Sequence, residues 1–145
     1  MADNKRFKYL EHVGDVYVAA YGNTLEKAFE SAALALMEVM TDTSKIILEV
    51  QEDVELESRD EYSLLYCWLE EFLILFEVEN LLFSKFEVLK IEEVERGFKL
   101  KARIGGQVFD AEKHSQRVGV KAVTYHLMEV VKKPGEVTLK FLLDI

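Results

Sequence analysis

The chain has 145 residues, of which 27 are acidic and 18 basic, and its formal net charge is −9. A hydrophobic content of 50% excludes a disordered tail or a fibrous repeat, and the length favours one domain over residues 1–145. The negative charge disfavours direct nucleic-acid binding, because phosphate backbones carry the same sign. A cation or a basic protein partner suits this charge better.

The single cysteine and the start of the chain bear on the compartment. Cys67 has no second cysteine with which to form an internal disulfide, a usage typical of reducing compartments. The first six residues lead into no apolar run, so no signal peptide is expected. No segment approaches the roughly 18–20 consecutive apolar residues that span a bilayer. These features predict a cytoplasmic protein without membrane attachment.

The amino-terminal half predicts two amphipathic helices set between strands. Apolar residues recur at helical spacing over residues 24–40 and again over residues 59–78. Asn23 and Ser58, each with a glutamate three residues later, match the capping box that opens a helix. The strands expected in this half are, in chain order, residues 7–11, 16–21 and 45–57.

The carboxy-terminal half predicts strands joined by tight turns. Residues 96–97, 105–106 and 134–135 carry the glycines and the proline typical of such turns. The strands expected between and around them are, in chain order, residues 83–95, 98–104, 107–109, 120–132 and 136–145. Tight turns indicate antiparallel pairing. We therefore expect an α+β fold, an antiparallel or mixed β-sheet covered by two main α-helices in a single two-layer domain.

Familiar catalytic motifs are absent from the sequence. It has no glycine-rich phosphate loop, no cysteine-rich zinc spacing and no serine nucleophile elbow. Carboxylates and histidines remain as candidates, beginning with His12 and Asp15. Gly14 lets the backbone turn there and leaves Asp15 free to project an acceptor, although an aspartate at such a position can simply bind turn amides.

A second candidate lies at residues 143–145. If Leu143 points into the core, the period of two places Asp144 on the opposite face. The Asp144 carboxylate and the main-chain or terminal oxygens of Ile145 would suit a hard cation such as Ca²⁺, Mg²⁺ or Mn²⁺. A solvated aspartate explains the same residues equally well.

Two further segments carry charge. Asp110 and His114 belong to a charged turn that can bind an anion or a partner, or remain a solvated loop. Lys121 can border a ligand or an interface. By strand alternation Glu129 is expected on the same face as Lys121.

Several short segments occur in an order that resembles a known family. They are His12 with Asp15, residues 22–30 (GNTLEKAFE), 39–42 (VMTD), 64–71 (LLYCWLEE), 81–84 (LLFS), Asp110 with Lys113 and His114, residues 120–126 (VKAVTYH), and Asp144 with Ile145. Together they make the chain similar to the archease family over nearly its whole length. Val13 departs from the family pattern, which often has threonine after the early histidine.

The resemblance implies an accessory protein and not an enzyme. Archeases activate the RtcB-type tRNA-splicing ligase by promoting its metal- and GTP-dependent guanylylation and its multiple turnover. The implied partner is therefore that ligase, and the implied cofactor is a divalent metal ion, Ca²⁺, Mg²⁺ or Mn²⁺.

The resemblance also implies a site. Its metal ligands would be Asp15, Asp144 and Ile145. The residues expected near the metal or at the partner contact are His12, Lys121, Glu129, Asp110 and His114.

Two other functions compete with this reading. The first is a chaperone-like modulator of RNA-modifying enzymes, in which the metal site is incidental. The second is a stand-alone metal-dependent hydrolase, which the sequence disfavours because it offers no evident pair of nucleophile and base.

Overall fold

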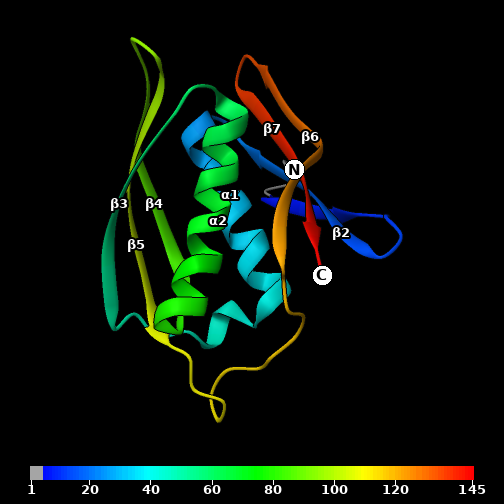
Figure 1. Cartoon of the computed structure of the whole chain (residues 1–145), viewed down its shortest axis with the longest axis vertical. Helices are drawn as coiled ribbons and strands as arrows, with labels where there is room; N and C mark the ends of the chain where they lie inside the picture. The colour runs from blue at the N-terminus through cyan, green and yellow to red at the C-terminus, as the bar shows by residue number, and fades with distance from the viewer. Residues whose placement is uncertain (1–4) are drawn as a thin grey trace.

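The computed structural model describes residues 5–145 (Figure 1). Residues 1–4 lie outside the described part, so the structure does not bear on the expectation that the chain starts without a signal peptide. The elements in chain order are β1 Phe7–Leu10, β2 Asp15–Gly22, α1 Leu25–Met40, the short 3-10 helix Thr43–Lys45, β3 Val50–Ser58, α2 Glu61–Glu79, β4 Leu81–Val94, β5 Gly97–Val108, β6 Ala122–Lys133 and β7 Glu136–Asp144. Neither helix of the described chain is both long and apolar enough to cross a membrane.

The strands form two antiparallel sheets with the helices between them. The sheet orders are β1-β2-β7-β6 and β3-β5-β4, and every pair of neighbours is antiparallel. In Figure 1, α1 and α2 lie between the β3-β5-β4 sheet on the left and the other sheet on the right. The predicted α+β class with two main helices is confirmed. The predicted single sheet is instead two sheets, because strand alternation does not say which strands pair.

The helix starts differ from the predicted ones by one or two residues. The side chain of Thr24, not Asn23, caps α1 by accepting from the Lys27 N–H at 3.1 Å. The capping box of α2 is formed by Asp60 and Ser63, with the Ser63 N–H donating to the Asp60 carboxylate at 2.7 Å. Ser58, the predicted cap, still belongs to β3.

The paired glycines at 105–106 lie inside a strand. Strand β5 runs without interruption between β3 and β4, so the predicted turn there is wrong. A Cβ on Gly106 would come within 1.8 Å of the Leu82 carbonyl oxygen. Glycine is therefore required by the close approach of the neighbouring strand and not by a change in chain direction. The predicted strand from residue 45 begins only at Val50, because Thr43–Lys45 forms the 3-10 helix.

The core is built around the two helices. Trp68 of α2 is fully buried, and its indole N–H donates to the Phe29 carbonyl of α1 at 2.9 Å. The Trp68 ring meets Phe72 edge to face at 4.8 Å between centroids. Buried residues surround most of α1 because it packs against β2 on one side and β4 on the other.

Two glutamates of α1 bind the outer edge of β4. Glu30 Oε2 accepts from the Val88 N–H at 2.9 Å, and Glu26 Oε2 accepts from the Ile91 N–H at 3.2 Å. Strand β4 is an edge of its sheet, so these backbone donors have no neighbouring strand on that side. The carboxylates therefore join α1 to the three-stranded sheet.

Replacing Glu30 with alanine is expected to lower the free energy of unfolding by about 1–3 kcal/mol, because the buried Val88 N–H would lose its acceptor. Chemical denaturation measures this loss. The exposed neighbour Glu87 provides the control, and Glu87→Ala is expected to stay within about 0.5 kcal/mol of the wild type. Equal effects of the two substitutions would contradict a bridging role for Glu30.

Candidate functional site

Two aspartates from distant parts of the chain meet at the edge of the four-stranded sheet. Strand β2 begins at Asp15, strand β7 ends at Asp144, and the antiparallel register makes their Cα atoms partners. Residues paired in this way project to the same face of a sheet, with their Cβ atoms about 4.5–5.5 Å apart. Like charges directly opposite each other are destabilising. A cation bound between them would remove that repulsion.

The face that carries this pair is turned away from the helical core. The neighbours Val16 and Leu143 are also partners, and Leu143 is fully buried in the core. Alternation therefore sends Asp15 and Asp144 outward, where both are partly exposed. The predicted placement of Asp144 on the face opposite Leu143 is confirmed.

The end of β7 is fixed from both sides. Asp144 pairs with Asp15 of β2 and with Ala122 of β6. The Lys121 backbone N–H donates to the Asp144 carbonyl oxygen at 2.7 Å. With that carbonyl engaged, the Asp144 carboxylate and the main-chain oxygen of Ile145 are the groups left to receive a cation. Lys121 itself lies one residue before β6 and is exposed.

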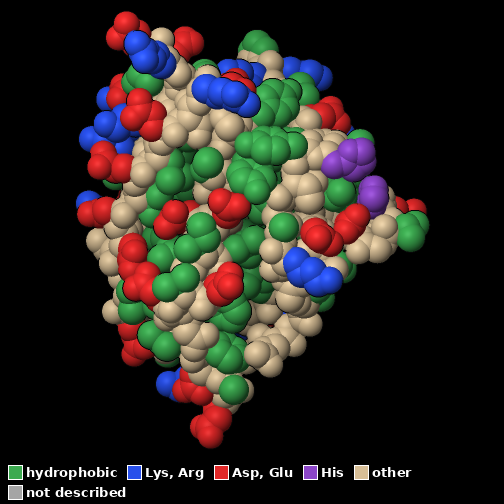
Figure 2. Space-filling model, viewed as in Figure 1, with side chains coloured by type: hydrophobic (Ala, Val, Ile, Leu, Met, Phe, Trp, Pro, Cys, Tyr) green, Lys and Arg blue, Asp and Glu red, His purple; other side chains and the backbone are tan. Residues whose placement is uncertain are grey.

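His12 is brought to the same place by the turn between β1 and β2. Its Nδ1 lies 3.7 Å from Asp15 Oδ2, and Gly14 adopts a positive φ of 79° that allows the turn. The imidazole meets Tyr17 edge to face, with 6.3 Å between ring centroids. Figure 2 shows histidine and acidic side chains next to one another over the four-stranded sheet. His12 therefore lies beside the Asp15 carboxylate, at a distance longer than a hydrogen bond.

Glu129 reaches this face through an irregularity in β6. Between two paired positions the chain advances five residues on β6, from Thr124 to Glu129, but only two on β7, from Leu142 to Lys140. Because of the extra residues, side chains between Lys121 and Glu129 do not alternate regularly between the two faces of the sheet. The predicted shared face of Glu129 and Lys121 therefore does not follow from alternation. Glu129 instead pairs with Lys140, which lies on the Asp144 face, and their charged groups are 3.9 Å apart.

Tyr17 and Lys140 also belong to this face and were not predicted. The Tyr17 hydroxyl donates to the Leu127 carbonyl oxygen at 2.8 Å, inside the irregular part of β6. Burial, and secondly the Glu129 carboxylate, raise the pKa of Tyr17, so its hydroxyl remains a proton donor. Tyr17 follows Asp15 by two residues, and this period-two spacing could have revealed it.

Asp110 and His114 lie away from this face, in the loop that follows β5. His114 is only 2% exposed, and its Nδ1 accepts from the Asp110 N–H at 2.9 Å. Because Nδ1 accepts, the ring proton is on Nε2, which donates to the Gln107 side-chain oxygen at 2.9 Å. The Asp110 carboxylate accepts from the Glu112 N–H. These bonds give both residues a structural role in the loop.

The donor set suits a hard cation that keeps water ligands. Within residues 5–145 there is no group of three or more histidine, cysteine, aspartate or glutamate side chains placed to hold a metal ion. A cation at Asp15 and Asp144 would rely on two carboxylates, a main-chain oxygen and water. Oxygen ligands of this kind fit Ca²⁺, Mg²⁺ or Mn²⁺ better than zinc, which prefers nitrogen and sulfur.

Comparison with known proteins decides the family. The sequence model described as the Archease protein family (MTH1598/TM1083) matches residues 7–145. The chain belongs to the archease family. The match covers both sheets and both helices and includes Asp15, Asp144 and Ile145.

Two archease relatives are similar to this chain over most of their length. Protein archease of Pyrococcus abyssi is 45% identical over 130 residues, covering 90% of this chain and 91% of that protein. Protein archease of Sulfolobus acidocaldarius is 44% identical over 140 residues, covering 97% and 99%.

Two solved structures have the same fold. The solution structure of Methanobacterium thermoautotrophicum protein 1598 aligns with a TM-score of 0.83 and 41% identity, covering 97% of this chain and 99% of that one. The crystal structure of an archease from Thermotoga maritima, described as a possible chaperone, aligns with a TM-score of 0.63. Its identity is 18% over 95% of this chain and 96% of that one, so this second likeness concerns the fold.

Proposed function

We propose that this archease is an accessory activator of an RtcB-type RNA ligase in tRNA splicing, and that it promotes guanylylation and repeated turnover of the ligase. The supporting observation is the cross-strand pairing of Asp15 with Asp144, which gathers two carboxylates on one exposed face. Membership of the archease family supports the choice of partner. The free thiol of Cys67 agrees with the cytoplasm, where we propose that the protein acts.

The residues have distinct parts in this proposal. Asp15, Asp144 and the main-chain oxygen of Ile145 would hold the ion, which would supply positive charge beside the phosphates of the ligase's nucleotide. His12, whose Nδ1 lies 3.7 Å from Asp15 Oδ2, would help to orient the Asp15 carboxylate, and the Lys121 N–H binds the Asp144 carbonyl oxygen. The protein itself makes and breaks no bond.

The charge of the whole chain favours such a partner. An enzyme that binds RNA presents basic surface to the phosphate backbone, and a protein with a net charge of −9 is attracted to that surface. The acidic face around Asp15 and Asp144 would thus dock near the ligase active site. Complementary charge of this kind speeds association and sets orientation.

Multiple-turnover ligation of a split tRNA tests the proposal. Substoichiometric wild-type protein is expected to accelerate the ligase, and the Asp15→Ala and Asp144→Ala variants are expected to lose most of that acceleration. Asp53→Ala, which removes a highly exposed carboxylate on β3, is the matched control and should activate normally. Full activation by both site variants at native-like folding would reject the metal-site mechanism.

A chaperone-like modulator is the second candidate function. Ile74 and Val78 of α2 are 45% and 75% exposed, and Figure 2 shows hydrophobic side chains on the surface. Apolar surface of this kind can bind other proteins. This candidate requires that the Asp15→Ala and Asp144→Ala variants activate the ligase like the wild type and that the protein suppresses aggregation of a client. Loss of activation in both variants at native-like folding would reject it.

A further inference from the structure

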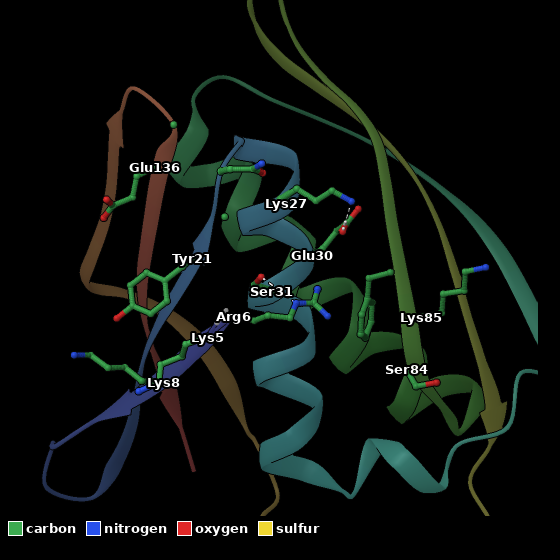
Figure 3. Close-up of a pocket in the computed structure, with 14 residues that line it drawn as sticks. Lys5, Arg6, Lys8, Tyr21, Lys27, Glu30, Ser31, Ser84, Lys85 and Glu136 are labelled. Atoms are coloured by element: carbon green, nitrogen blue, oxygen red, sulfur yellow. Dashed lines mark hydrogen bonds and ion pairs between the residues drawn. The ribbon is translucent and has the colours of Figure 1, made fainter. Parts of the chain in front are cut away.

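A groove of about 1060 Å³ opens between the edges of the two sheets. Strands β1 and β2 line one side, β4 lines the other, and the first turns of α1 form its floor (Figure 3). The volume lies at the upper limit of the roughly 300–1,000 Å³ typical of pockets that hold small-molecule ligands. The candidate metal face uses none of the residues that line this groove.

The charge of the groove is opposite to that of the whole chain. Two acidic side chains line it, Glu30 and Glu136, against a larger number of basic ones. The basic residues are Lys5, Arg6, Lys8, Lys27 and Lys85. A local excess of positive charge on a protein with a net charge of −9 concentrates small anions at one place.

The acidic residue at the centre of the groove is already bound on both oxygens. Glu30 is 6% exposed, and its Oε2 accepts from the Val88 N–H at 2.9 Å. Its Oε1 lies 3.4 Å from the Lys27 ammonium. Glu30 therefore joins α1 to β4 and pairs with Lys27 at the floor of the groove, while the Lys27 side chain stays 63% exposed.

Arg6 is positioned beside this pair. Its Nε donates to the Ser31 hydroxyl oxygen at 3.4 Å, and no carboxylate of residues 5–145 forms an ion pair with it. A guanidinium has five N–H donors, so most remain for a ligand. In Figure 3, Arg6 and Lys27 point toward Glu30 and Ser31 at the centre, whereas Lys8 and Lys85 extend to opposite sides.

We propose that this groove binds a small polyphosphate-type anion, with Arg6 and Lys27 as its direct contacts. Arginine forms paired hydrogen bonds to phosphate oxygens, and a lysine ammonium adds a point charge. A short anion can be neutralised by the local cations, whereas a long nucleic acid would also meet the acidic remainder of the surface. This inference needs neither the metal site nor the ligase.

Isothermal titration with inorganic tripolyphosphate at low salt tests the proposal. A chelator in the buffer prevents a metal from bridging the anion to Asp15 and Asp144. The Arg6→Ala/Lys27→Ala variant is expected to bind about ten-fold more weakly or worse, since charge-assisted hydrogen bonds are lost. Lys101→Ala is the control, because Lys101 also pairs with a glutamate, Glu55 at 3.6 Å, but on the other sheet.

Three results would overturn the proposal. They are no binding by the wild type, equal binding by the double variant and Lys101→Ala, and equal or tighter binding of a single-stranded oligonucleotide without terminal phosphate. Arg6→Gln provides a second variant that keeps a donor for Ser31 and removes the charge and the terminal guanidinium donors, and circular dichroism verifies its fold. Asp144→Asn should bind tripolyphosphate like the wild type, so this test is separate from that of the proposed function.

Discussion

Divalent cations are expected to raise the Tm of the wild-type protein, and the Asp144→Asn variant is expected to lose that increase. A ligand that binds only the folded state at about 100 times its Kd stabilises it by about 2.7 kcal/mol. For a domain of this length, that corresponds to on the order of 5–10 °C in Tm. Thermal unfolding with Ca²⁺, Mg²⁺ or Mn²⁺, compared with a chelator, measures the shift.

The same experiment separates a metal ligand from a structural residue. In the chelator, Asp144→Asn should be at least as stable as the wild type, because it removes the repulsion between Asp144 and Asp15. Asp53→Asn removes an exposed carboxylate elsewhere and should keep the full cation response. A cation-dependent increase that survives in Asp144→Asn would exclude Asp144 as a ligand.

Replacing Trp68 with alanine is expected to lower the free energy of unfolding by about 3–5 kcal/mol. Trp68 is fully buried, and its removal leaves a large cavity and removes the hydrogen bond from its indole N–H to the Phe29 carbonyl of α1. Since whole domains are stable by only about 5–15 kcal/mol, this single change would remove a large share of the total. Guanidinium denaturation should be followed by circular dichroism, because Trp68 is the only tryptophan and the Trp68→Ala variant therefore has no tryptophan fluorescence to report unfolding.

Two further variants separate the loss of buried packing from the loss of the indole hydrogen bond and from the loss of an exposed ring. Trp68→Phe keeps an aromatic ring but not the N–H donor, so its cost should be smaller than that of Trp68→Ala. Tyr62→Ala on the same helix removes a ring that is 42% exposed and should cost far less than Trp68→Ala. If Trp68→Ala and Tyr62→Ala destabilise equally, packing between α1 and α2 is not the main source of stability.

The helices could be predicted because their apolar residues repeat at helical spacing, whereas their caps could not be assigned with the same accuracy. Asn23 and Thr24 are adjacent residues that both favour the capping position, and only the backbone geometry selects Thr24. Similarly, Asp60 caps α2 because β3 extends to Ser58. Local patterns define an element more reliably than its ends.

The arrangement of strands depended on contacts that local sequence does not encode. Gly105 and Gly106 resemble a turn, yet the requirement on Gly106 comes from the Leu82 backbone of the neighbouring strand. The division into two sheets follows from α1, which is apolar around most of its surface and needs a partner on both sides. Alternation within one strand carries no information about either fact.

The candidate site shows the same limit. The outward direction of Asp144 followed from alternation with Leu143, but its pairing with Asp15 depends on the register between β2 and β7. The place of Glu129 depends on the irregular part of β6, where Leu127 has a positive φ of 61°. A non-glycine residue in that conformation is not foreseeable from spacing.

The central place of β7 in its sheet has a consequence for the order of assembly. Asp15 lies near one end of the described chain and Asp144 near the other, so the paired carboxylates come together only after β7 has entered between β2 and β6. Contacts between such distant segments slow folding, because the chain loses loop entropy before the contacts can form. If Asp15 and Asp144 bind a cation as proposed, a newly made chain would acquire that affinity only once β7 is in place, and cation uptake would report that the sheet is complete.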